Sequence, residues 1–290
     1  MKLTNTYGLP EAMVRVISQN EREREGYSIT DIDSSPRQLQ LIRRHWREIE
    51  TDVAERLWAL LGTSVHYILE KGATPSSLTE EALTMKVDGI DIKGHSDLWK
   101  DKCIEDYKVT SAWTIIYNPK GRREWHSQLN MYIPLWQSYG FPVEKLKIWA
   151  ILRDWQKSKA LYNYGYPKIP FVGIDIPIWD IDTIMAYIRL RLAIHETSVA
   201  LPDEALPLCT PAEMWEKPTI YAVHKEGRKS ALKLCDTPKE ADDYMLNNTG
   251  KLHVQERPGC RIKCDDYCDA APYCNQYKKY KEVAIDKDRT

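Results

Sequence analysis

Alternating polar and apolar residues between positions 90 and 110 predict a β-hairpin, and this hairpin decides where three charged side chains meet. The alternation runs into a polar turn at 100–102 and then resumes, which is the pattern of two neighbouring antiparallel strands. Asp106 and Lys108 are two residues apart on the second strand, so their side chains leave the same face. Asp97, near the end of the first strand, can meet them across the pair. The hairpin therefore brings two carboxylates and an ammonium to one place.

Two carboxylates beside a lysine can bind a hard divalent cation and stabilise negative charge that develops in a reaction. Strand parity points Glu105 to the opposite face, while His95 shares the face of Asp97 and is a weaker ligand candidate. An Asp-x-Lys triplet is by itself a weak signal, because 42 acidic and 41 basic residues among 290 make such triplets common. A solvent-exposed ion pair is the alternative interpretation. Other motifs in the chain are needed to distinguish a metal site from an exposed ion pair.

The composition is that of a soluble globular protein. Hydrophobic residues make up 43% and charged residues 29%, the mean hydropathy is −0.52, and no apolar run is long enough to span a bilayer. The N-terminus lacks the basic and then apolar pattern of a signal peptide, so we expect a cytoplasmic protein with no membrane partner. Because the net charge is −1, any contact with DNA must come from local basic patches.

Helical and strand-like segments alternate along residues 28–200. Helices are predicted within 28–61, 62–72, 123–140 and 180–199, and strands follow the hairpin near 145–155 and 172–179. This order predicts an α/β or α+β core whose central sheet is flanked by helices. Residues 1–27 are predicted to be a polar, irregular segment with a solvated helix face at 21–25, and residues 278–290 a charged, disordered tail.

Several polar residues on the predicted helices and loops have positions suited to binding metal or DNA. His66 and Glu70 are four apart on one helix, Gln128 and Tyr132 are four apart on another, and the basic candidates are Arg43, Arg44, Arg122 and Arg123. The arginines can hold phosphates, although ion pairs on the protein surface explain the same pattern. A lone histidine on a helix is more often structural than a ligand, so His66 gains its interest from the hairpin downstream.

Seven cysteines are present, and four of them fall within fifteen residues near the C-terminus. In a reducing compartment this density favours metal or cluster ligation over disulfides. The four are Cys260, Cys264, Cys268 and Cys274, and Cys209 precedes a small insert, about 219–256, with the predicted order strand, strand, helix, strand. Residues 201–277 are therefore predicted to be a cysteine-cluster region. Cys103 and Cys235 lie in apolar strand patterns and are predicted to be buried.

In these motifs the sequence resembles the PD-(D/E)XK nuclease superfamily and, within it, the RecB-like phage and CRISPR-associated exonucleases. GTSVHYILE looks like the first motif of that group, KGHSDLW like its G-x-x-D motif, EDYK like (D/E)-x-K and QLNMY like Q-x-x-x-Y. The C-terminal cysteines resemble its iron–sulfur clasp. The resemblance covers roughly residues 28–277, and motifs in the right order are more specific than any one of them. It implies a restriction-endonuclease-like mixed sheet flanked by helices.

The resemblance also implies a role for each matching residue. His66, Asp97, Asp106 and the backbone carbonyl of Tyr107 would bind Mg²⁺ or Mn²⁺, Lys108 would orient or activate the attacking water, and Gln128 and Tyr132 would position the DNA. Glu70 would orient His66. Cys209, Cys264, Cys268 and Cys274 would hold a [4Fe–4S] cluster that ties the C-terminal segment back onto the chain. A zinc ion in place of the cluster, and Cys260 in place of Cys209, are alternatives.

The implied function is that of a metal-dependent DNA exonuclease acting on single-stranded or duplex ends. It would be phage-encoded and act in DNA replication, recombination or repair, with replication or recombination proteins as partners. A structure-specific or restriction-like endonuclease is one alternative, and a DNA-binding module without turnover is another. A binding role gives no reason to keep three metal ligands and a lysine together, so we expect an enzyme. Polarity, strand preference and oligomeric state stay open at this point.

Overall fold

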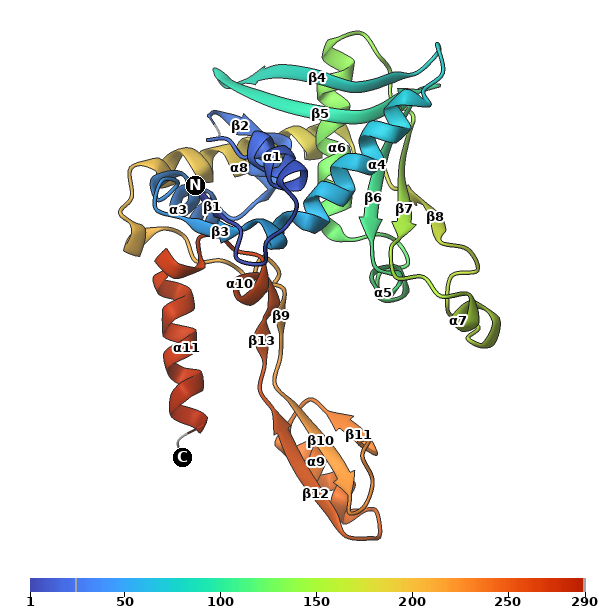
Figure 1. Cartoon of the computed structure of the whole chain (residues 1–290), viewed down its shortest axis with the longest axis vertical. Helices are drawn as coiled ribbons and strands as arrows, with labels where there is room; N and C mark the ends of the chain where they lie inside the picture. Colours follow the sequence, from blue (N-terminus) through green and yellow to red (C-terminus); the bar gives the residue numbers. More distant parts are fainter. Residues whose placement is uncertain (24, 289–290) are drawn as a thin grey trace. The chain divides into compact units, whose positions relative to one another are not determined.

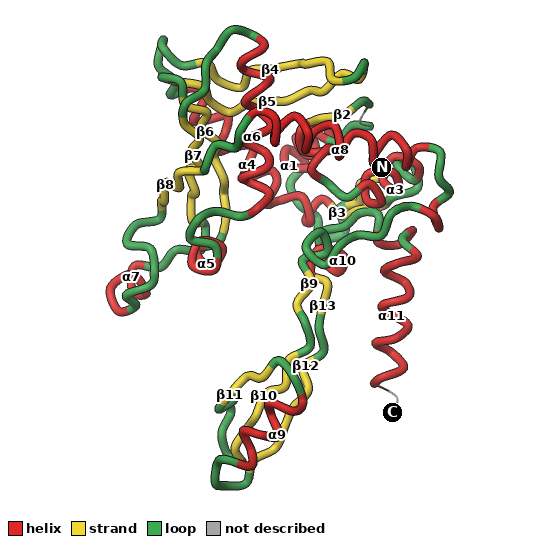
Figure 2. Tube along the Cα trace, turned by 180° about the vertical axis from the view of Figure 1, so that it is seen from behind, coloured by secondary structure: helices red, strands yellow, loops and turns green. Residues whose placement is uncertain are grey.

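The computed structural model describes residues 1–23 and 25–288, and the chain divides into two compact units, Met1–Leu201 and Pro202–Thr290. Figures 1 and 2 show the elements of both units from opposite sides. Within the described part of the chain, no helix combines the length and the apolarity that a membrane span requires.

The described residues of the first unit form eight strands and eight α-helices, with a short 3₁₀ turn at Val53–Arg56. They are β1 (Lys2–Thr4), α1 (Glu11–Asn20), β2 (Tyr27–Ser28), α2 (Ile29–Asp33), α3 (Pro36–Arg44), β3 (Glu50–Asp52), α4 (Leu57–Lys71), β4 (Leu78–Val87), β5 (Ile90–Lys100), β6 (Cys103–Thr110), α5 (Ala112–Tyr117), α6 (Arg123–Ser138), β7 (Lys145–Leu152), α7 (Lys157–Tyr162), β8 (Phe171–Ile176) and α8 (Ile181–Val199).

A six-stranded mixed sheet is the centre of this unit. Its strands run in the order β2-β5-β6-β7-β8, and β4 pairs with the other edge of β5. Strands β6 and β7 are parallel, whereas the β4–β5, β5–β6 and β7–β8 pairs are antiparallel. Helix α6 packs against β4 to β7, and α4 packs against β6. The prediction of a mixed central sheet flanked by helices is confirmed.

Two tight turns fix the register of the long strands. Asp88 and Gly89, with φ of 49° and 87°, join β4 to β5, and Asp101 and Lys102, with φ of 48° and 62°, join β5 to β6. Type I′ turns need positive φ at both central residues, and Asp-Gly is among the strongest sequence signals for them. The β5–β6 hairpin was predicted, but β4 was not, although the Asp88-Gly89 pair marks where it ends.

The core of the first unit is formed by the sheet together with α2, α6 and α8. Leu129, Ile133 and Trp136, the predicted buried stripe of α6, are all at most 3% exposed. Burying side chains of this size stabilises the fold by about 1.5–3 kcal/mol each. The helix packs closely on the sheet at Gly94 of β5, where an added Cβ would lie 2.6 Å from Cε1 of Tyr132. Helix α6 is thus fixed tightly on the strand that carries Asp97.

The N-terminal segment is more regular than predicted. Strand β1 pairs in parallel with β3, and α1 follows it. Asp52 explains part of this order, because its Oδ2 accepts hydrogen bonds from the Thr6 amide at 2.8 Å and the Thr4 hydroxyl at 3.0 Å. The helix face expected at 21–25 is wrong for the described positions, since α1 ends at Asn20; position 24 lies outside the described residues.

The second unit carries the insert and the cysteines. Its elements are a 3₁₀ turn (Asp203–Ala205), β9 (Glu216–Lys217), β10 (Ile220–Lys225), β11 (Lys233–Cys235), α9 (Pro238–Leu246), β12 (Leu252–Arg257), β13 (Cys260–Arg261), α10 (Ile262–Asp266), a 3₁₀ turn (Ala271–Tyr273) and α11 (Asn275–Asp288). Strands β9 and β13 pair with each other, and β11-β10-β12 form a separate sheet. Cys235 is buried beneath α9, and Cys103 is buried in the first unit, as predicted.

The charged C-terminal tail is helical as far as Asp288, so the prediction of disorder is wrong there; residues 289–290 lie outside the described part. Asp265 supplies the reason. Its Oδ1 lies 2.7 Å from Lys281 Nζ and accepts a hydrogen bond from the Tyr277 hydroxyl. Because these partners are four residues apart on α11, one carboxylate of α10 fastens one face of the helix. Composition alone does not show this pairing.

Candidate metal centre

The centre forms where β5 and β6 separate. The two strands pair only from Leu98–Glu105 to the turn, so Asp97 and Asp106 are the first residues beyond the ladder. Beyond this point, side chains supply the hydrogen-bond partners of the Tyr107 backbone. Its amide donates to Asp97 Oδ2 at 2.8 Å, and its carbonyl oxygen lies 3.0 Å from His66 Nε2. The fork therefore orients both an acid and an imidazole around one residue, Tyr107.

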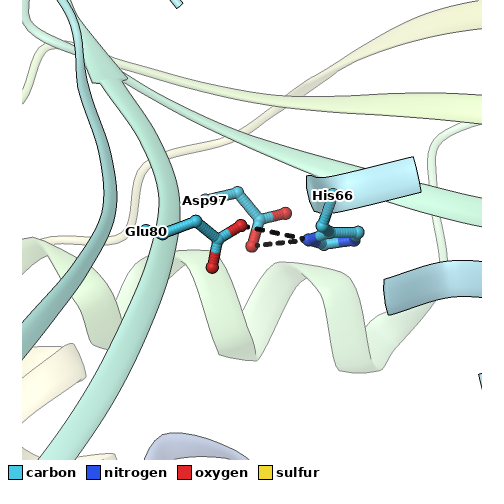
Figure 3. Close-up of side chains that lie close together, drawn as sticks. All are labelled: His66, Glu80 and Asp97. Carbon is cyan, nitrogen blue, oxygen red and sulfur yellow. Dashed lines mark ion pairs between the residues drawn. The ribbon is translucent and has the colours of Figure 1, made fainter. Parts of the chain in front are cut away.

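Three side chains come close enough together to share a metal ion (Figure 3). One potential ligand atom from each of His66, Glu80 and Asp97 lies within 4.8 Å of the others. His66 Nδ1 is 3.3 Å from Asp97 Oδ1 and 3.5 Å from Glu80 Oε1. Helix α4 supplies the imidazole, and β4 and β5 supply the carboxylates.

Glu80 was missed by the sequence analysis. It has φ of 52°, in the left-handed region that a side chain with a Cβ rarely adopts. Its neighbours Thr79 and Glu81 pair with Leu98 and Ser96, so the ladder is interrupted where Glu80 stands opposite Asp97. Backbone strain of this kind concentrates at functional sites. Glu80 was missed because β4 was not predicted. The Asp88-Gly89 turn was the sequence signal from which β4 could have been predicted.

The charges of this group reinforce one another. The hydrogen bond to Asp97 raises the pKa of His66 to about 9, and the charges of Asp97, Asp106 and Glu80 add to the effect. Burial and then the charge of Asp97 raise the pKa of Glu80. The carboxylates of Glu80 and Asp97 repel each other, and the His66 imidazolium is the only positive charge within this group of three. A divalent cation placed between them would reduce the repulsion.

Asp106 and Lys108 form the second half of the centre. Lys108 Nζ donates to Asp106 Oδ1 at 2.9 Å and to Gln128 Oε1 at 3.0 Å. Asp106 is only 3% exposed, and its burial raises its pKa to about 6 against the opposing effect of Lys108. Its Oδ2 lies 2.7 Å from the ammonium but accepts no well-aligned hydrogen bond from the described residues. Asp106 Oδ2 therefore has a close ionic contact with Lys108 but no well-aligned hydrogen bond from the described residues.

Tyr132 lies beneath the centre rather than in it. It is 4% exposed, its hydroxyl donates to the His95 carbonyl, and burial raises its pKa. Strand β2 pairs with β5 at Ile92–Lys93 and β6 pairs with it only from Leu98. His95 lies between these two stretches, and the Tyr132 hydroxyl gives its carbonyl a hydrogen-bond donor there. The His95 side chain is exposed on the same strand. The structure therefore shows Tyr132 supporting the strand of Asp97, and its predicted role in positioning DNA stays a prediction.

Two other acidic residues lie outside the group of three ligands. Glu105 accepts a hydrogen bond from Trp149 Nε1 on the next strand, opposite to Asp106, as strand parity predicted. Glu70 pairs with Lys71 at 3.7 Å. Neither side chain takes part in the contacts around His66 described above.

The four predicted DNA-binding arginines make contacts within the first unit. Arg43 donates to the Gly26 carbonyl, and Arg44 to the carbonyls of Ser198 and Val199 at 3.1 and 3.0 Å. Arg122 pairs with Glu124 at 3.4 Å, and Arg123 donates to the Tyr187 hydroxyl at 3.4 Å. These contacts give each guanidinium a structural partner. Phosphate binding by these residues stays a prediction.

The predicted cluster cysteines influence one another in the second unit. The pKa of Cys264 is raised to about 12, first by burial and then by the thiols of Cys268, Cys209 and Cys274. Burial raises the pKa of Cys268 to about 11, again with Cys209 and Cys274 contributing. Cys260 is exposed and is not among the main causes of either shift.

Buried Gln276, another residue that the sequence analysis missed, fixes Cys209. Its Oε1 accepts from the Cys209 amide at 2.8 Å, and its Nε2 donates to the Cys209 carbonyl at 2.9 Å. This amide pair joins Cys209 to α11, directly beside Cys274. No sequence pattern predicts a contact between residues as far apart along the chain as Cys209 and Gln276.

No family model matches the sequence, and no curated protein matches it. The similar solved structures include the crystal structure of SSO0001, with 19% identity, a TM-score of 0.43, and coverage of 65% of this chain and 87% of that chain. An alkaline exonuclease, LHK-Exo from Laribacter hongkongensis, has 13% identity and a TM-score of 0.37, with coverage of 60% and 89%. Its complex with dAMP gives 15% identity, a TM-score of 0.35 and the same coverage of 60% and 89%.

Proposed function

We propose that this protein is a metal-dependent DNA nuclease that works as an exonuclease. One observation carries the proposal: the strand fork sets His66, Glu80 and Asp97 beside an Asp106–Lys108 pair. The motif resemblance supports the finer assignment to phage DNA replication, recombination or repair. Hydrolysis of a phosphodiester needs charge stabilisation at the phosphate and a positioned water, and these two groups of residues are suited to those two tasks.

The residues present fit a divalent cation. Carboxylate and carbonyl oxygens with one imidazole are ligands that Mg²⁺ and Mn²⁺ accept. Asp106 is 3% exposed and its Oδ2 lies 2.7 Å from the Lys108 ammonium, and a divalent cation would further stabilise this buried charge. We propose His66, Asp97, Asp106 and the Tyr107 carbonyl as ligands, with Glu80 as a fifth. A cation held there would stabilise charge on the scissile phosphate and lower the pKa of a bound water.

Lys108 acts beside the cation site. Its ammonium is held by Asp106 on its own strand and by Gln128 of α6, so its direction is fixed from two sides. A fixed ammonium can hydrogen-bond a water molecule and stabilise negative charge without reorganising during the reaction. Gln128 is a positioning residue in this assignment, since it acts through Lys108.

Cleavage of defined DNA substrates tests the function. End-labelled linear single and double strands and a covalently closed circle are incubated with Mg²⁺, Mn²⁺ or EDTA, using protein purified without oxygen. We expect metal-dependent shortening from one end with the circle left intact, which also gives the polarity. Cutting of the circle would establish an endonuclease instead. Absence of cleavage with both cations would leave only a DNA-binding role.

The pH dependence of metal binding follows from His66. Its pKa is raised to about 9, so near neutral pH a proton occupies the imidazole and competes with the cation. We expect the affinity for Mn²⁺ to rise about tenfold per pH unit between roughly pH 7 and 9 and to level off above. In the metal-free protein the sign is opposite: the imidazolium stabilises the fold fully below about pH 6.5, and this contribution is lost through pH 9.

Isothermal titration calorimetry in buffers of different ionisation enthalpy measures this linkage. The wild type should release about one proton per Mn²⁺ at pH 8. His66→Ala should bind more weakly and release correspondingly fewer protons. An equal pH slope in the variant would show that another group carries the proton.

We further propose that Cys209, Cys264, Cys268 and Cys274 hold a [4Fe–4S] cluster. The electrostatic contacts among these thiols favour this set over one that contains Cys260. The spacing of Cys264, Cys268 and Cys274 differs from the paired C-x-x-C of zinc ribbons, and together with the motif resemblance this supports the cluster over a zinc ion.

Three serine substitutions test the cluster: Cys268 belongs to both possible ligand sets, whereas Cys260 and Cys209 distinguish them. Cys268→Ser should lose iron and sulfide and lower the thermal midpoint of the second unit, by about 4–8 °C for each kcal/mol lost. Cys260→Ser, the matched control, should keep both the iron and the midpoint, because its side chain is exposed. Loss of iron from Cys260→Ser with retention in Cys209→Ser would reverse the assignment.

A further inference from the structure

Three aromatic side chains of the first unit are exposed at one end of the sheet. Trp58 of α4 is 58% exposed, and Trp113 and Tyr117 of α5 are 40% and 76% exposed. Helix α4 is apolar in sequence, but it packs against β6 with no fully buried residue, so its side chains are only partly covered by the rest of the unit. Exposed rings of this size are expected at binding surfaces.

The parallel pairing of β6 and β7 brings these rings to the same edge. Both strands end there, and the Arg153 amide just after β7 donates to the Thr110 carbonyl at 2.9 Å. Asp154 then caps α5, accepting from the Ser111 hydroxyl at 2.6 Å and the Ala112 amide at 2.7 Å. The beginning of α5 is thus fixed beside Arg153.

Cationic side chains lie over two of the rings. The Arg153 guanidinium is 4.2 Å from the centroid of Trp58, and the Lys159 ammonium is 5.4 Å from that of Trp113. Trp113 and Tyr117 are stacked, with centroids 6.0 Å apart and planes at 25°. Rings arranged beside cations match the two parts of a nucleotide, since bases stack and phosphates pair with positive charge.

Two elements lead from these rings to the metal centre. Trp58 and His66 are eight residues apart on α4, a rise of about 12 Å. Trp113 follows Lys108 by five residues, along the end of β6 and the first turn of α5. A strand lying on the rings can therefore continue into the centre within a few nucleotides.

We propose that Trp58, Trp113 and Tyr117 form a stacking platform for unpaired bases of the substrate, with Arg153 and Lys159 holding its phosphates. The proposal rests on the nuclease function and names the form of DNA that enters the centre, a single strand. Duplex DNA keeps its base faces covered, so it cannot use exposed rings in this way. A protein partner would meet the rings without needing a cation beside them, so the charges favour the nucleic acid.

Binding without metal tests the platform separately from catalysis. The fluorescence anisotropy of a fluorescein-labelled thymidine oligonucleotide is measured in EDTA, beside an abasic strand of the same length. Tyr117→Ala and Trp58→Ala should bind the thymidine strand about tenfold more weakly, the expected loss of one base stack, and the abasic strand as the wild type does. Tyr7→Ala is the matched control, because Tyr7 is 77% exposed in the N-terminal segment.

The outcomes distinguish the two proposals. If the wild type cleaves DNA but Tyr117→Ala and Trp58→Ala both bind like Tyr7→Ala, the platform is wrong and the nuclease stands. Equal weakening for the thymidine and abasic strands would also reject the platform, because the rings would not be contacting bases. If no DNA is cleaved yet binding falls selectively for the thymidine strand, the platform holds and the nuclease function fails.

Discussion

Replacing Lys108 with alanine is expected to lower the rate of DNA cleavage by about 10²–10³-fold, the usual cost of removing one preorganised charge-stabilising group. The reason is geometric. Asp106 and Gln128 hold the ammonium in one direction, and no other described lysine or arginine makes contacts with both of them. The rate is measured on the end-labelled strand that the wild type shortens, at saturating Mn²⁺.

Metal binding and folding separate this expectation from simple damage. Lys108→Ala should keep the circular dichroism spectrum and bind Mn²⁺, since the proposed ligands remain in place. Lys147→Ala is the control, because this lysine lies on β7 and pairs with Asp175 at 3.3 Å. Cleavage by Lys108→Ala at the wild-type rate would falsify the assignment of the centre.

The second large effect is expected at Gly94, where even one methyl group has no room. A Cβ there would lie 2.6 Å from Tyr132 Cε1, 3.1 Å from Leu135 Cδ2 and 3.2 Å from Ile29 Cγ1. Overpacking of this kind costs about 1–3 kcal/mol, and we expect Gly94→Ala to reduce the free energy of unfolding by that amount. Cleavage should fall as well, because α6 would move away from β5 and take Gln128 with it.

Urea unfolding measures the first effect, and a second glycine provides the comparison. Gly62 of α4 has no atom within 4 Å of its would-be Cβ, so Gly62→Ala should be stabilising by about 0.5–1 kcal/mol. Adding Tyr132→Leu to Gly94→Ala should recover part of the loss, since the two positions share one contact. Gly94→Ala with wild-type stability would mean that α6 does not pack as described.

Local patterns indicated which hairpin residues lie near one another in the structure, because these residues are close in sequence. Asp97, Asp106 and Lys108 lie on one hairpin, and period-two alternation with a polar turn is enough to place them together. His66 and Gln128 come from separate helices, and it was the motif resemblance that joined them to the hairpin. The same alternation correctly predicted that the Glu105 side chain lies on the opposite face of β6 from Asp106.

The features that were missed depend on backbone conformation and on distant contacts. Glu80 reaches the centre through a left-handed backbone, which no propensity predicts for a glutamate. The hydrogen bond from the Tyr132 hydroxyl to the His95 carbonyl was also not predicted, because it depends on how closely α6 packs on Gly94. The exposure of Trp58 and Tyr117 could not be inferred from aromatic content, because aromatic residues are more often buried in a core.

The parallel pairing of β6 with β7 also sets the order in which the centre can assemble. The β5–β6 hairpin closes through two residues and can form within microseconds, whereas Cys103 meets Lys145 only after the intervening chain has crossed the sheet. Asp106 and Lys108 share one short strand, so they are neighbours in the hairpin while it is still surrounded by water. Their burial comes later, when the crossover closes and brings α6 and Gln128 over them. We therefore expect the closure of the β6–β7 crossover to be also the step that dehydrates the charged pair.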